Sequence, residues 1–504
     1  MSITTWRRLR RLVQVVSLVV FLAMIVALGS AGRLHPRPIL LMRLDPLAAL
    51  VSMLAARRWI VTFVPAIILL LAALGLGRFW CGWLCPLGTL IDWISPRKVN
   101  PLKASPSHWR GLKYGLLFTI LFLALWGNLT LLFLDPLTVL VRGVGAVILP
   151  GLTWLVTAAE LVLYRVPFLR GALDVVDGAL RGRVIEYVQP FSAGAIGITA
   201  LFGGALALNW TARRGWCRYV CPLGGLFALV SKVSWLKRVV SSDCVNCGAC
   251  ARDCRMGTID PKKGYASDSG ECILCLDCAV NCPKQAISFG SNWRMDRGWS
   301  YDPNRRQALA ALGASLGGLA LLKIAPSAHH PHSYRLRPPA AEEESLLAAC
   351  VRCGACLRVC PTHGLQPSLA EAGLEGLWTP VLTPRLGPCE YTCTACGQVC
   401  PTGAIPKVTP ATKWATPIGK AYVNPSLCIP WSGRGECIVC EEMCPLPDKA
   451  IKLQEVEIVA SDGSARQAQA PVVIHDACIG CGLCESKCPI NGAAAIRVMV
   501  DPMS

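Results

Sequence analysis

The amino-acid sequence predicts an α-helical membrane bundle that carries small, cysteine-rich α+β domains. The chain has 504 residues, of which 53% are hydrophobic, and its mean hydropathy is +0.46. This composition is too apolar for an ordinary soluble protein, and the length allows several domains. The hydrophobic residues are concentrated before residue 210, whereas most of the twenty-eight cysteines follow it in repeated spacing motifs.

Four segments have the length and apolar character of transmembrane helices: 12–31, 59–77, 114–134 and 191–210. Each is close to the roughly 20 residues that cross a bilayer. A fifth apolar stretch, 144–164, contains Pro150 and Glu160. We interpret it as an interfacial or packed helix, because a full span there would invert the topology of everything that follows.

The net charge of +19 does not indicate a nucleic-acid partner. Many of the basic residues lie in three segments that flank the predicted spans: Arg7 to Arg11, 78–113 and 213–238. The positive-inside rule explains this distribution and places the three segments in the cytoplasm. The lipid bilayer is therefore an expected partner, and nucleic acid is not.

The membrane half contains an internal duplication. Leu44-Asp45-Pro46-Leu47 recurs at 134–137, and the cysteine-pair motif at 80–88 recurs at 216–224. Cys81 and Cys85, like Cys217 and Cys221, are spaced i and i+4 and so face the same way on a helix. The four thiols are candidates for catalysis at the cytoplasmic interface. A seventh metal cluster, a redox-active thiol site and a purely structural contact all remain open.

The other cysteines form six quartets, most of them with the spacing C-x2-C-x2-C-x3-C, which is typical of [4Fe–4S] ligation. Zinc sites and disulfide frameworks do not predict four cysteines within eleven residues. The predicted ligands are Cys244, Cys247, Cys250 and Cys254; Cys272, Cys275, Cys278 and Cys282; Cys350, Cys353, Cys356 and Cys360; Cys389, Cys393, Cys396 and Cys400; Cys428, Cys437, Cys440 and Cys444; and Cys478, Cys481, Cys484 and Cys488.

Paired quartets are expected to exchange their last ligand, as in two-cluster ferredoxins. Short apolar, strand-like segments follow several quartets, at 286–289, 404–405, 450–453 and 495–498. The plan is that of bacterial-type polyferredoxin domains. Their small cores leave much of the folding energy to the metal–thiolate bonds.

Between the second and third quartets, Arg305 and Arg306 precede a short, Gly-rich apolar segment that looks like a twin-arginine export signal. The sequence thus divides into a four-span membrane domain (1–239), a cytoplasmic two-cluster ferredoxin domain (240–295), a signal or anchor helix (300–325), a linker (326–344) and a periplasmic four-cluster ferredoxin domain (345–504). His329, His330 and His332 are interpreted as part of a solvated tether rather than a metal site.

Residues 1 to about 295 resemble the membrane component of a quinol dehydrogenase, the NapH and MauN type. The four spans, the two C-x3-C-P motifs and the quartets at Cys244 and Cys272 carry this resemblance. Residues from about 300 onward resemble its periplasmic partner, the NapG and MauM type, through the twin arginine and the order of the last four quartets. The two appear fused head to tail, and Arg255 replaces the proline expected after Cys254.

The resemblance implies a quinol dehydrogenase component of the bacterial inner membrane, active in anaerobic respiration. It would pass electrons from the membrane quinone pool to a periplasmic redox enzyme or cytochrome, such as a nitrate-reductase-type system. Independently, the chain has no CxxCH motif and no histidine within a predicted span, so haem is not expected. The alternatives are an assembly factor that reduces a metal or thiol for another enzyme, and a passive polyferredoxin relay.

No cofactor motif lies within the roughly 30 Å of hydrocarbon between the inner and outer clusters. Either quinone bridges them, or the two halves serve different donors. Trp80, Trp83 and Trp216 could line a quinone pocket, but interfacial tryptophan belts are more common at such positions.

Overall fold

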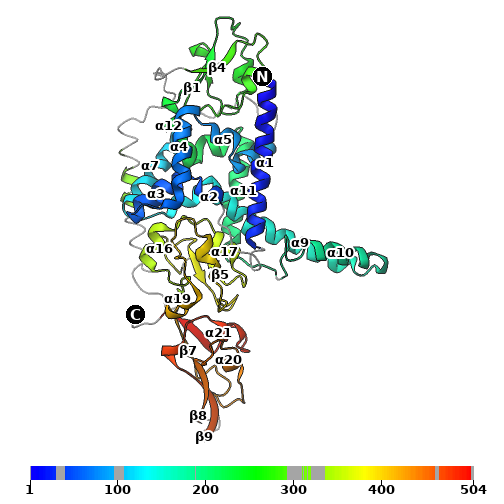
Figure 1. Cartoon of the computed structure of the whole chain (residues 1–504), viewed down its shortest axis with the longest axis vertical. Coiled ribbons are helices and arrows are strands. Elements are labelled where there is room, and N and C mark those ends of the chain that lie inside the picture. Colours follow the sequence, from blue (N-terminus) through cyan, green and yellow to red (C-terminus); the bar gives the residue numbers. More distant parts are fainter. Residues whose placement is uncertain are drawn as a thin grey trace. The chain divides into compact units, whose positions relative to one another are not determined.

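The computed structural model describes residues 2–29, 40–95, 107–187, 189–291, 335–369, 371–459 and 465–500, with a few positions between 309 and 318. The chain forms two compact units (Figure 1). The first contains 1–25, 39–147 and 196–320; the second contains 26–38, 148–195 and 321–504. Most of the predicted signal helix at 300–325 and most of the linker, with its three histidines, lie outside the described residues; 309, 312–314 and 316–318 are helical.

The first unit contains most of the apolar helices. Their bounds are α1 Ile3–Gly29, α2 Leu40–Arg43, α3 Pro46–Ala56, α4 Val64–Leu76, α5 Phe79–Trp83, α6 Pro86–Ile94, α7 Gly111–Leu125, α8 Pro136–Arg142, α11 Ala195–Thr211 and α12 Pro222–Val230. Two π-helical turns, η6 Gly143–Ile148 and η8 Trp216–Val220, interrupt this pattern. Helices α3, α6, α8 and α12 each begin with proline, whose fixed φ suits the first helical position.

Two helices among the described residues are long and apolar enough to cross a membrane: Ile3–Gly29 and the continuous helix Pro136–Leu163, which ends with α9 (Leu149–Leu163). The first matches the predicted span at 12–31. The other three predicted spans contain the shorter helices Val61–Leu76, Gly111–Leu125 and Ala195–Thr211, so a bundle of four full-length spans is not confirmed. The stretch 144–164, expected to be interfacial, belongs instead to a helix of spanning length.

The third predicted span ends early for a local reason. Helix α7 stops at Leu125, and Gly127 then adopts a φ of +77°, which glycine tolerates without strain. The side-chain oxygen of Asn128 next accepts a hydrogen bond from the backbone N–H of Thr130 at 2.9 Å. This turn ends α7 before the predicted span does, and the rest of that span forms a separate 3-10 helix, η5 (Thr130–Leu134).

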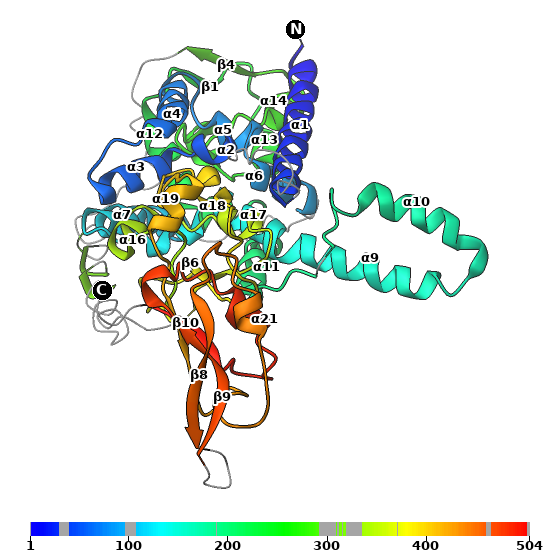
Figure 2. The same cartoon turned by 60° about the horizontal axis from the view of Figure 1, so that its bottom comes forward.

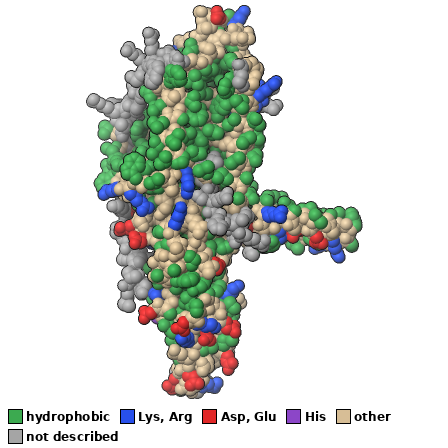
Figure 3. All heavy atoms as spheres, viewed as in Figure 1, with side chains coloured by type: hydrophobic (Ala, Val, Ile, Leu, Met, Phe, Trp, Pro, Cys, Tyr) green, Lys and Arg blue, Asp and Glu red, His purple; other side chains and the backbone are tan. Residues whose placement is uncertain are grey.

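Large apolar side chains cover much of the visible surface of the helical part, whereas charged side chains gather over the part built by the C-terminal residues (Figure 3). Trp59 is 82% exposed, Val61 79% and Ile196 87%. An exposed apolar surface of this kind marks an interaction site, and lipid is one partner that would cover it. Together with the two long helices, it gives modest support to membrane association.

The duplicated Leu-Asp-Pro-Leu motifs form matching helix starts. The Asp45 carboxyl accepts hydrogen bonds from the backbone N–H groups of Leu47 and Ala48, at 2.9 and 3.2 Å, and caps α3. The Asp135 carboxyl does the same for Leu137 and Thr138, at 2.9 and 3.0 Å, and caps α8. Both aspartates are fully buried.

The first cysteine-rich module follows α12. Strand β1 (Leu236–Val240) pairs antiparallel with β4 (Ile287–Ser291), with Leu236 opposite Ser291. Between them lie α13 (Ala249–Asp253), the short pair β2 (Ile259–Asp260) and β3 (Ala266–Ser267), and α14 (Asp277–Val280). The strand predicted at 286–289 is therefore present as β4.

The second unit consists of a helical hairpin and a larger cysteine-rich module. The hairpin consists of α9 and α10 (Arg170–Leu180) (Figure 2). An ion pair from Arg181, at the end of α10, to Glu160 on α9 joins the two helices. The module contains α16 Glu343–Ala349, α17 Ala355–Val359, β5 Leu365–Pro367, β6 Pro380–Leu382, α18 Ala395–Val399, α19 Pro410–Ala415, β7 Lys420–Val423, α20 Val439–Glu442, β8 Ile451–Val459, β9 Ala465–Val473, α21 Leu483–Lys487 and β10 Ile496–Met499.

The strands of this module pair antiparallel as β5 with β6, β7 with β10 and β8 with β9. The strands predicted at 450–453 and 495–498 are present as parts of β8 and β10. The segment 404–405 is not a strand; Ala404 and Ile405 are buried beside the cysteine loops instead.

Candidate metal centres

The two membrane cysteine pairs have the same local structure. Cys85 and Cys221 are the N-caps of α6 and α12, and their sulfur atoms accept hydrogen bonds from the backbone N–H groups of Gly88 and Gly224, at 3.4 and 3.2 Å. In both repeats the backbone N–H of the second cysteine donates to the carbonyl of the tryptophan five residues earlier, at 2.9 Å. The sequence repeat is therefore also a structural repeat.

The fold brings the two pairs together. Cys81, Cys85, Cys217 and Cys221 are all buried, with 8%, 7%, 7% and 4% of their surface exposed. Burial raises the pKa of the Cys221 thiol well above its usual range, and the neighbouring thiols of Cys217, Cys81 and Cys85 act in the same direction. The four thiols are therefore close enough to influence one another. The expected i, i+4 alignment on one helix is wrong, because Cys85 and Cys221 have extended backbone at the N-caps of α6 and α12, outside the helix that precedes each. We refer to these four residues as the four-cysteine centre.

Two fully buried arginines join the repeats around this centre. Arg78, in the first repeat, donates to the backbone carbonyl of Cys217 at 3.1 Å. Arg214, in the second, donates to the carbonyl of Cys81 at 2.7 Å. Each repeat therefore supplies the arginine that holds the cysteine of the other. Sequence analysis missed this pair, although an arginine stands three residues before the first cysteine in both repeats.

The donor set of the four-cysteine centre fits an iron–sulfur cluster. Four thiols are the ligands such a cluster takes, and two guanidinium groups offset part of the thiolate charge. The indole N–H groups of Trp80 and Trp216 and the Nε of Arg78 are buried with no acceptor among the described side chains. An additional sulfur-containing group would supply acceptors in these same segments.

Within the described ranges, no three Cys, His, Asp or Glu side chains converge closely enough to hold one ion. That statement covers the ferredoxin quartets as well as the four-cysteine centre. A cubane of eight atoms is wider than one ion and takes its thiols from farther apart.

The four-cysteine centre lies directly against the second ferredoxin quartet. A Cβ atom on Gly82 would collide with the backbone carbonyl of Ile273, between Cys272 and Cys275. The indole N–H of Trp83 donates to the carbonyl of Leu274 at 3.0 Å. The segment that separates Cys81 from Cys85 is thus packed on the segment that separates two predicted cluster ligands.

A buried carboxylate strengthens this contact. Glu271, the residue before Cys272, pairs with Arg78 at 2.7 Å and with Lys113, and it accepts a hydrogen bond from Tyr114 at 2.7 Å. Lys113 and Arg78 hold the pKa of Glu271 at about 2, although burial alone would raise it. Arg78 therefore touches both the four-cysteine centre and the ferredoxin loop.

Two of the three tryptophans are too buried to belong to an interfacial belt. Trp80 and Trp216 are only 2% and 3% exposed, so neither is part of an interfacial belt. Trp83 bonds to the ferredoxin loop and meets Trp6 edge-on, with ring centroids 6.3 Å apart. The described structure gives these tryptophans packing and docking contacts.

In the first module, the last cysteine of one quartet lies among the thiols of the other. Burial raises the pKa of Cys272 to about 12, with Cys278 and Cys254 among the thiols that add to the shift. Cys250, Cys254, Cys278 and Cys282 belong to one buried cluster around Ile259 and Ile287. This placement is the one that an exchange of last ligands requires.

The second module repeats this arrangement of the last cysteines twice. Cys350, Cys353, Cys356 and Cys400 line one cavity, and Cys428, Cys437, Cys440 and Cys488 line another. Burial raises the pKa of Cys396 to about 12, and the thiols of Cys389, Cys393 and Cys360 contribute. Cys481 has Cys478 and Cys444 as neighbours in the same way. Cys400 and Cys488 therefore lie beside the first three cysteines of the neighbouring quartet, as an exchange of last ligands between quartets would require.

Comparison with known families matches the same segments. A family described as a 4Fe-4S binding domain matches 58–102 and 194–241, each of which contains one membrane cysteine pair. A 4Fe-4S dicluster domain matches 349–404, and another 4Fe-4S binding domain matches 471–492. Two cysteines alone cannot complete a four-thiolate site, but the fold unites both pairs.

Curated relatives identify the family. The chain is 40% identical over 206 residues to the methylamine utilization ferredoxin-type protein MauM of Methylorubrum extorquens, covering 39% of this chain and 89% of the relative. It is 34% identical over 213 residues to the ferredoxin-type protein NapG of Escherichia coli, covering 41% and 89%. The putative electron transport protein YccM of Escherichia coli is 27% identical over 217 residues, 41% of this chain and 49% of that protein.

No solved structure matches significantly. The NapG and MauM resemblance expected from the last four quartets is supported by these relatives, whereas the NapH and MauN resemblance of the membrane half is not among them. With nearly nine-tenths of the MauM and NapG sequences covered at 34–40% identity, the chain belongs to the MauM/NapG family of ferredoxin-type iron–sulfur proteins.

Proposed function

We propose that this protein takes electrons from quinol in the membrane and passes them through iron–sulfur clusters to a periplasmic redox enzyme or cytochrome. The observation that carries the proposal is the packing of the four-cysteine centre on the loop between Cys272 and Cys275. A buried thiol site in contact with a cluster-binding loop is suited to electron exchange. The names of the relatives, ferredoxin-type and electron transport, point in the same direction.

The six quartets would hold six [4Fe–4S] clusters, and the four-cysteine centre would hold a seventh. Bound clusters supply one-electron carriers. The protein supplies their thiolates, excludes water from the four-cysteine centre and fixes its distance to the ferredoxin loop through Gly82 and Trp83. Arg78 and Arg214 act as positioning residues, because they hold the cysteine carbonyls rather than the reacting group.

We place the membrane domain (1–239) in the bacterial inner membrane, with 240–295 in the cytoplasm and 345–504 in the periplasm. The basic segments flanking the helices and the Arg305-Arg306 pair support this topology. A reporter active only in the periplasm should be active when fused after Ser504 and silent when fused after Ser291. Activity at both junctions would refute the topology.

The decisive experiment removes the four-cysteine centre. Anaerobically purified protein should contain about twenty-eight iron atoms, and Cys81→Ser should contain about twenty-four. The variant's clusters should no longer be reduced by menaquinol in liposomes, while dithionite should still reduce them. Iron analysis and the visible absorbance of the clusters measure both effects.

Cys437→Ser provides the matched control. It should also lose about four iron atoms, but from the C-terminal module, and quinol should still reduce the clusters that remain. Normal quinol-linked reduction in Cys81→Ser would show that the four-cysteine centre is dispensable for electron entry. A wild-type iron content near twenty-four would limit the chain to six clusters.

A further inference from the structure

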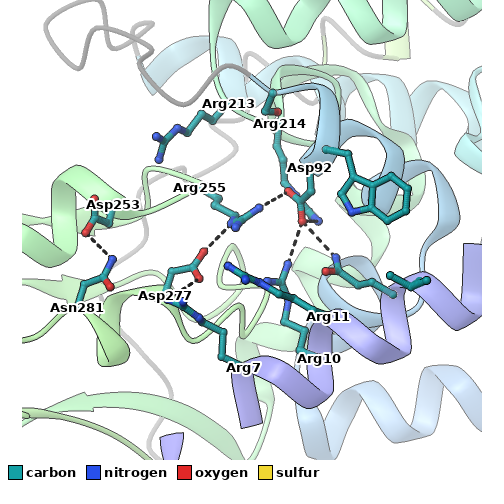
Figure 4. A pocket seen from close by; sticks show the side chains of 14 residues that line it. Arg7, Arg10, Arg11, Asp92, Arg213, Arg214, Asp253, Arg255, Asp277 and Asn281 are labelled. Carbon is teal, nitrogen blue, oxygen red and sulfur yellow. Dashed lines mark hydrogen bonds and ion pairs between the residues drawn. The ribbon is translucent and has the colours of Figure 1, made fainter. Parts of the chain in front are cut away.

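A large polar pocket lies in the first unit beside the four-cysteine centre. Its volume is about 650 Å³. Helices α1 and α6, the turn before η8 and the first ferredoxin module all contribute to its wall (Figure 4). The charged residues that line it are Arg7, Arg10, Arg11, Arg213, Arg214 and Arg255, with Asp92, Asp253 and Asp277.

The carboxylates of this pocket are already engaged. Asp92 pairs with Arg10, Arg214 and Arg255, at 2.9, 2.7 and 3.0 Å. Asp277 pairs with Arg255 at 2.6 Å, and Asp253 accepts a hydrogen bond from Asn281 at 2.8 Å. Of these bonds, drawn in Figure 4, the Asp92–Arg255 pair ties α6 to the ferredoxin module.

The pocket nevertheless retains a surplus of positive charge, because six arginines face three aspartates. Arg7 reaches Asp277 only at 4.0 Å. Arg11 is exposed and makes no recorded ion pair or hydrogen bond within the described residues. Several guanidinium groups surround this one polar cavity. They can donate charge-assisted hydrogen bonds to the oxygens of a phosphate group.

Two exposed apolar side chains are also part of the pocket. Val15 and Trp93 line it and are 38% and 58% exposed. Val15 lies on α1, which is long and apolar enough to span a membrane and carries these arginines at its N-terminal end. A free phosphate would leave Val15 and Trp93 bare, whereas a phospholipid would cover them with its acyl chains.

We propose that this pocket binds the headgroup of an anionic phospholipid at the cytoplasmic surface of the membrane. The inference rests on the proposed membrane location, in which α1 begins in the cytoplasm. Basic pockets between membrane helices on that side take anionic headgroups. Because the pocket joins α1 to the loops around Arg255 and Asp277, the bound lipid also offsets repulsion among the arginines and stabilises the docked ferredoxin module.

Binding is measured directly, without any electron-transfer assay, so that failure of this inference and failure of the proposed function can be told apart. The holoprotein in a neutral detergent is titrated with phosphatidylglycerol, phosphatidylcholine or inorganic phosphate, and bound lipid is counted by native mass spectrometry. We expect phosphatidylglycerol to bind and the other two to bind at least tenfold more weakly.

Substitutions at the pocket test its residues. Arg11→Gln and Arg213→Gln should each weaken phosphatidylglycerol binding by about tenfold, the value of one hydrogen bond to a charged group. Arg8→Gln is the matched control, because Arg8 is exposed on the same helix but does not line the pocket. It should leave binding unchanged.

Three results would overturn the inference: equal binding of phosphatidylcholine, equal binding of inorganic phosphate, or an equal loss in Arg8→Gln. The last result would indicate diffuse attraction to the basic end of α1. Iron content shows that each variant is folded, and Arg11→Gln alone suffices if Arg213→Gln fails this check, since Arg11 is exposed.

Discussion

The two membrane repeats place an arginine, a tryptophan and a cysteine pair in the same order, but their arginines have different carboxylate partners. Arg78 pairs with Glu271, which belongs to the ferredoxin module. Arg214 pairs with Asp92, which belongs to α6 in the membrane half. Glu271 is closed off between Arg78, Lys113 and Tyr114, whereas Asp92 lines an open pocket.

The repeats also differ at the residue after the first cysteine. Gly82 allows the backbone to touch the carbonyl of Ile273, whereas its counterpart Arg218 reaches over Gly257. Duplication therefore gave a symmetric four-cysteine centre with asymmetric surroundings. The backbone of the first repeat contacts the loop between two predicted cluster ligands. The second repeat contacts the ferredoxin module through the side chain of Arg218. We infer that the first repeat is the one that exchanges electrons with the ferredoxin module.

Among the substitutions that test this difference between the two repeats, Glu271→Gln should destabilise the protein most. It leaves Arg78 and Lys113 buried without a counter-charge, which costs about 3–5 kcal/mol. The counterpart Asp92→Asn should cost less, about 1–3 kcal/mol, because Asp92 borders a pocket, Arg255 keeps Asp277, and Arg10 and Arg214 keep backbone carbonyls. Chemical denaturation in detergent and limited proteolysis within 240–291 measure both.

Glu457→Gln is the control for these two variants, because Glu457 is exposed on β8 and makes no recorded bond. It should unfold like the wild type. Equal destabilisation by Glu271→Gln and Asp92→Asn would remove the distinction between the two anchors, and a larger effect of Asp92→Asn would reverse it.

A smaller effect is expected for Gly82→Ala. The added Cβ meets the backbone carbonyl of Ile273, which cannot move aside as a side chain could, so the loop must shift at a cost of about 1–3 kcal/mol. Gly75→Ala, in open space on α4, should be neutral or stabilising by up to about 1 kcal/mol. We expect Gly82→Ala also to slow reduction of the ferredoxin clusters by quinol, measured by stopped-flow absorbance. Unchanged stability and rate would argue against a close contact at this position.

Local spacing predicted much of the candidate sites. The quartets and the membrane cysteine pairs were recognised from residues a few positions apart, and the fold brings the two pairs near one another. It does so without the helical i, i+4 alignment that the spacing suggested, since Cys85 and Cys221 cap the following helices. The placement of Cys400 beside the thiols of the Cys350 quartet was expected only in general terms, from the way two-cluster ferredoxins share ligands.

The contacts between distant segments could not be predicted in this way. Arg78 and Glu271 are 193 positions apart, and no sequence motif around either residue indicates which residue it pairs with. Hydrophobicity also overestimated the helices, since it does not register the turn at Gly127 and Asn128 that ends α7. The π-turns at 143–148 and 216–220 were likewise missed, because they are changes of hydrogen-bond register rather than of composition.

The crossed arginine contacts set an order of events in synthesis. When Cys81 and Cys85 leave the ribosome they are half of a site, and Arg78 has no carbonyl to hold until Cys217 has been made. Arg214 then binds the carbonyl of Cys81 and joins the second repeat to the first. The two repeats meet as the two subunits of a two-fold dimer do, although they belong to one chain. All four cysteines can therefore come together only after the second repeat has been made, and a chain interrupted between the repeats would lack the complete four-cysteine centre.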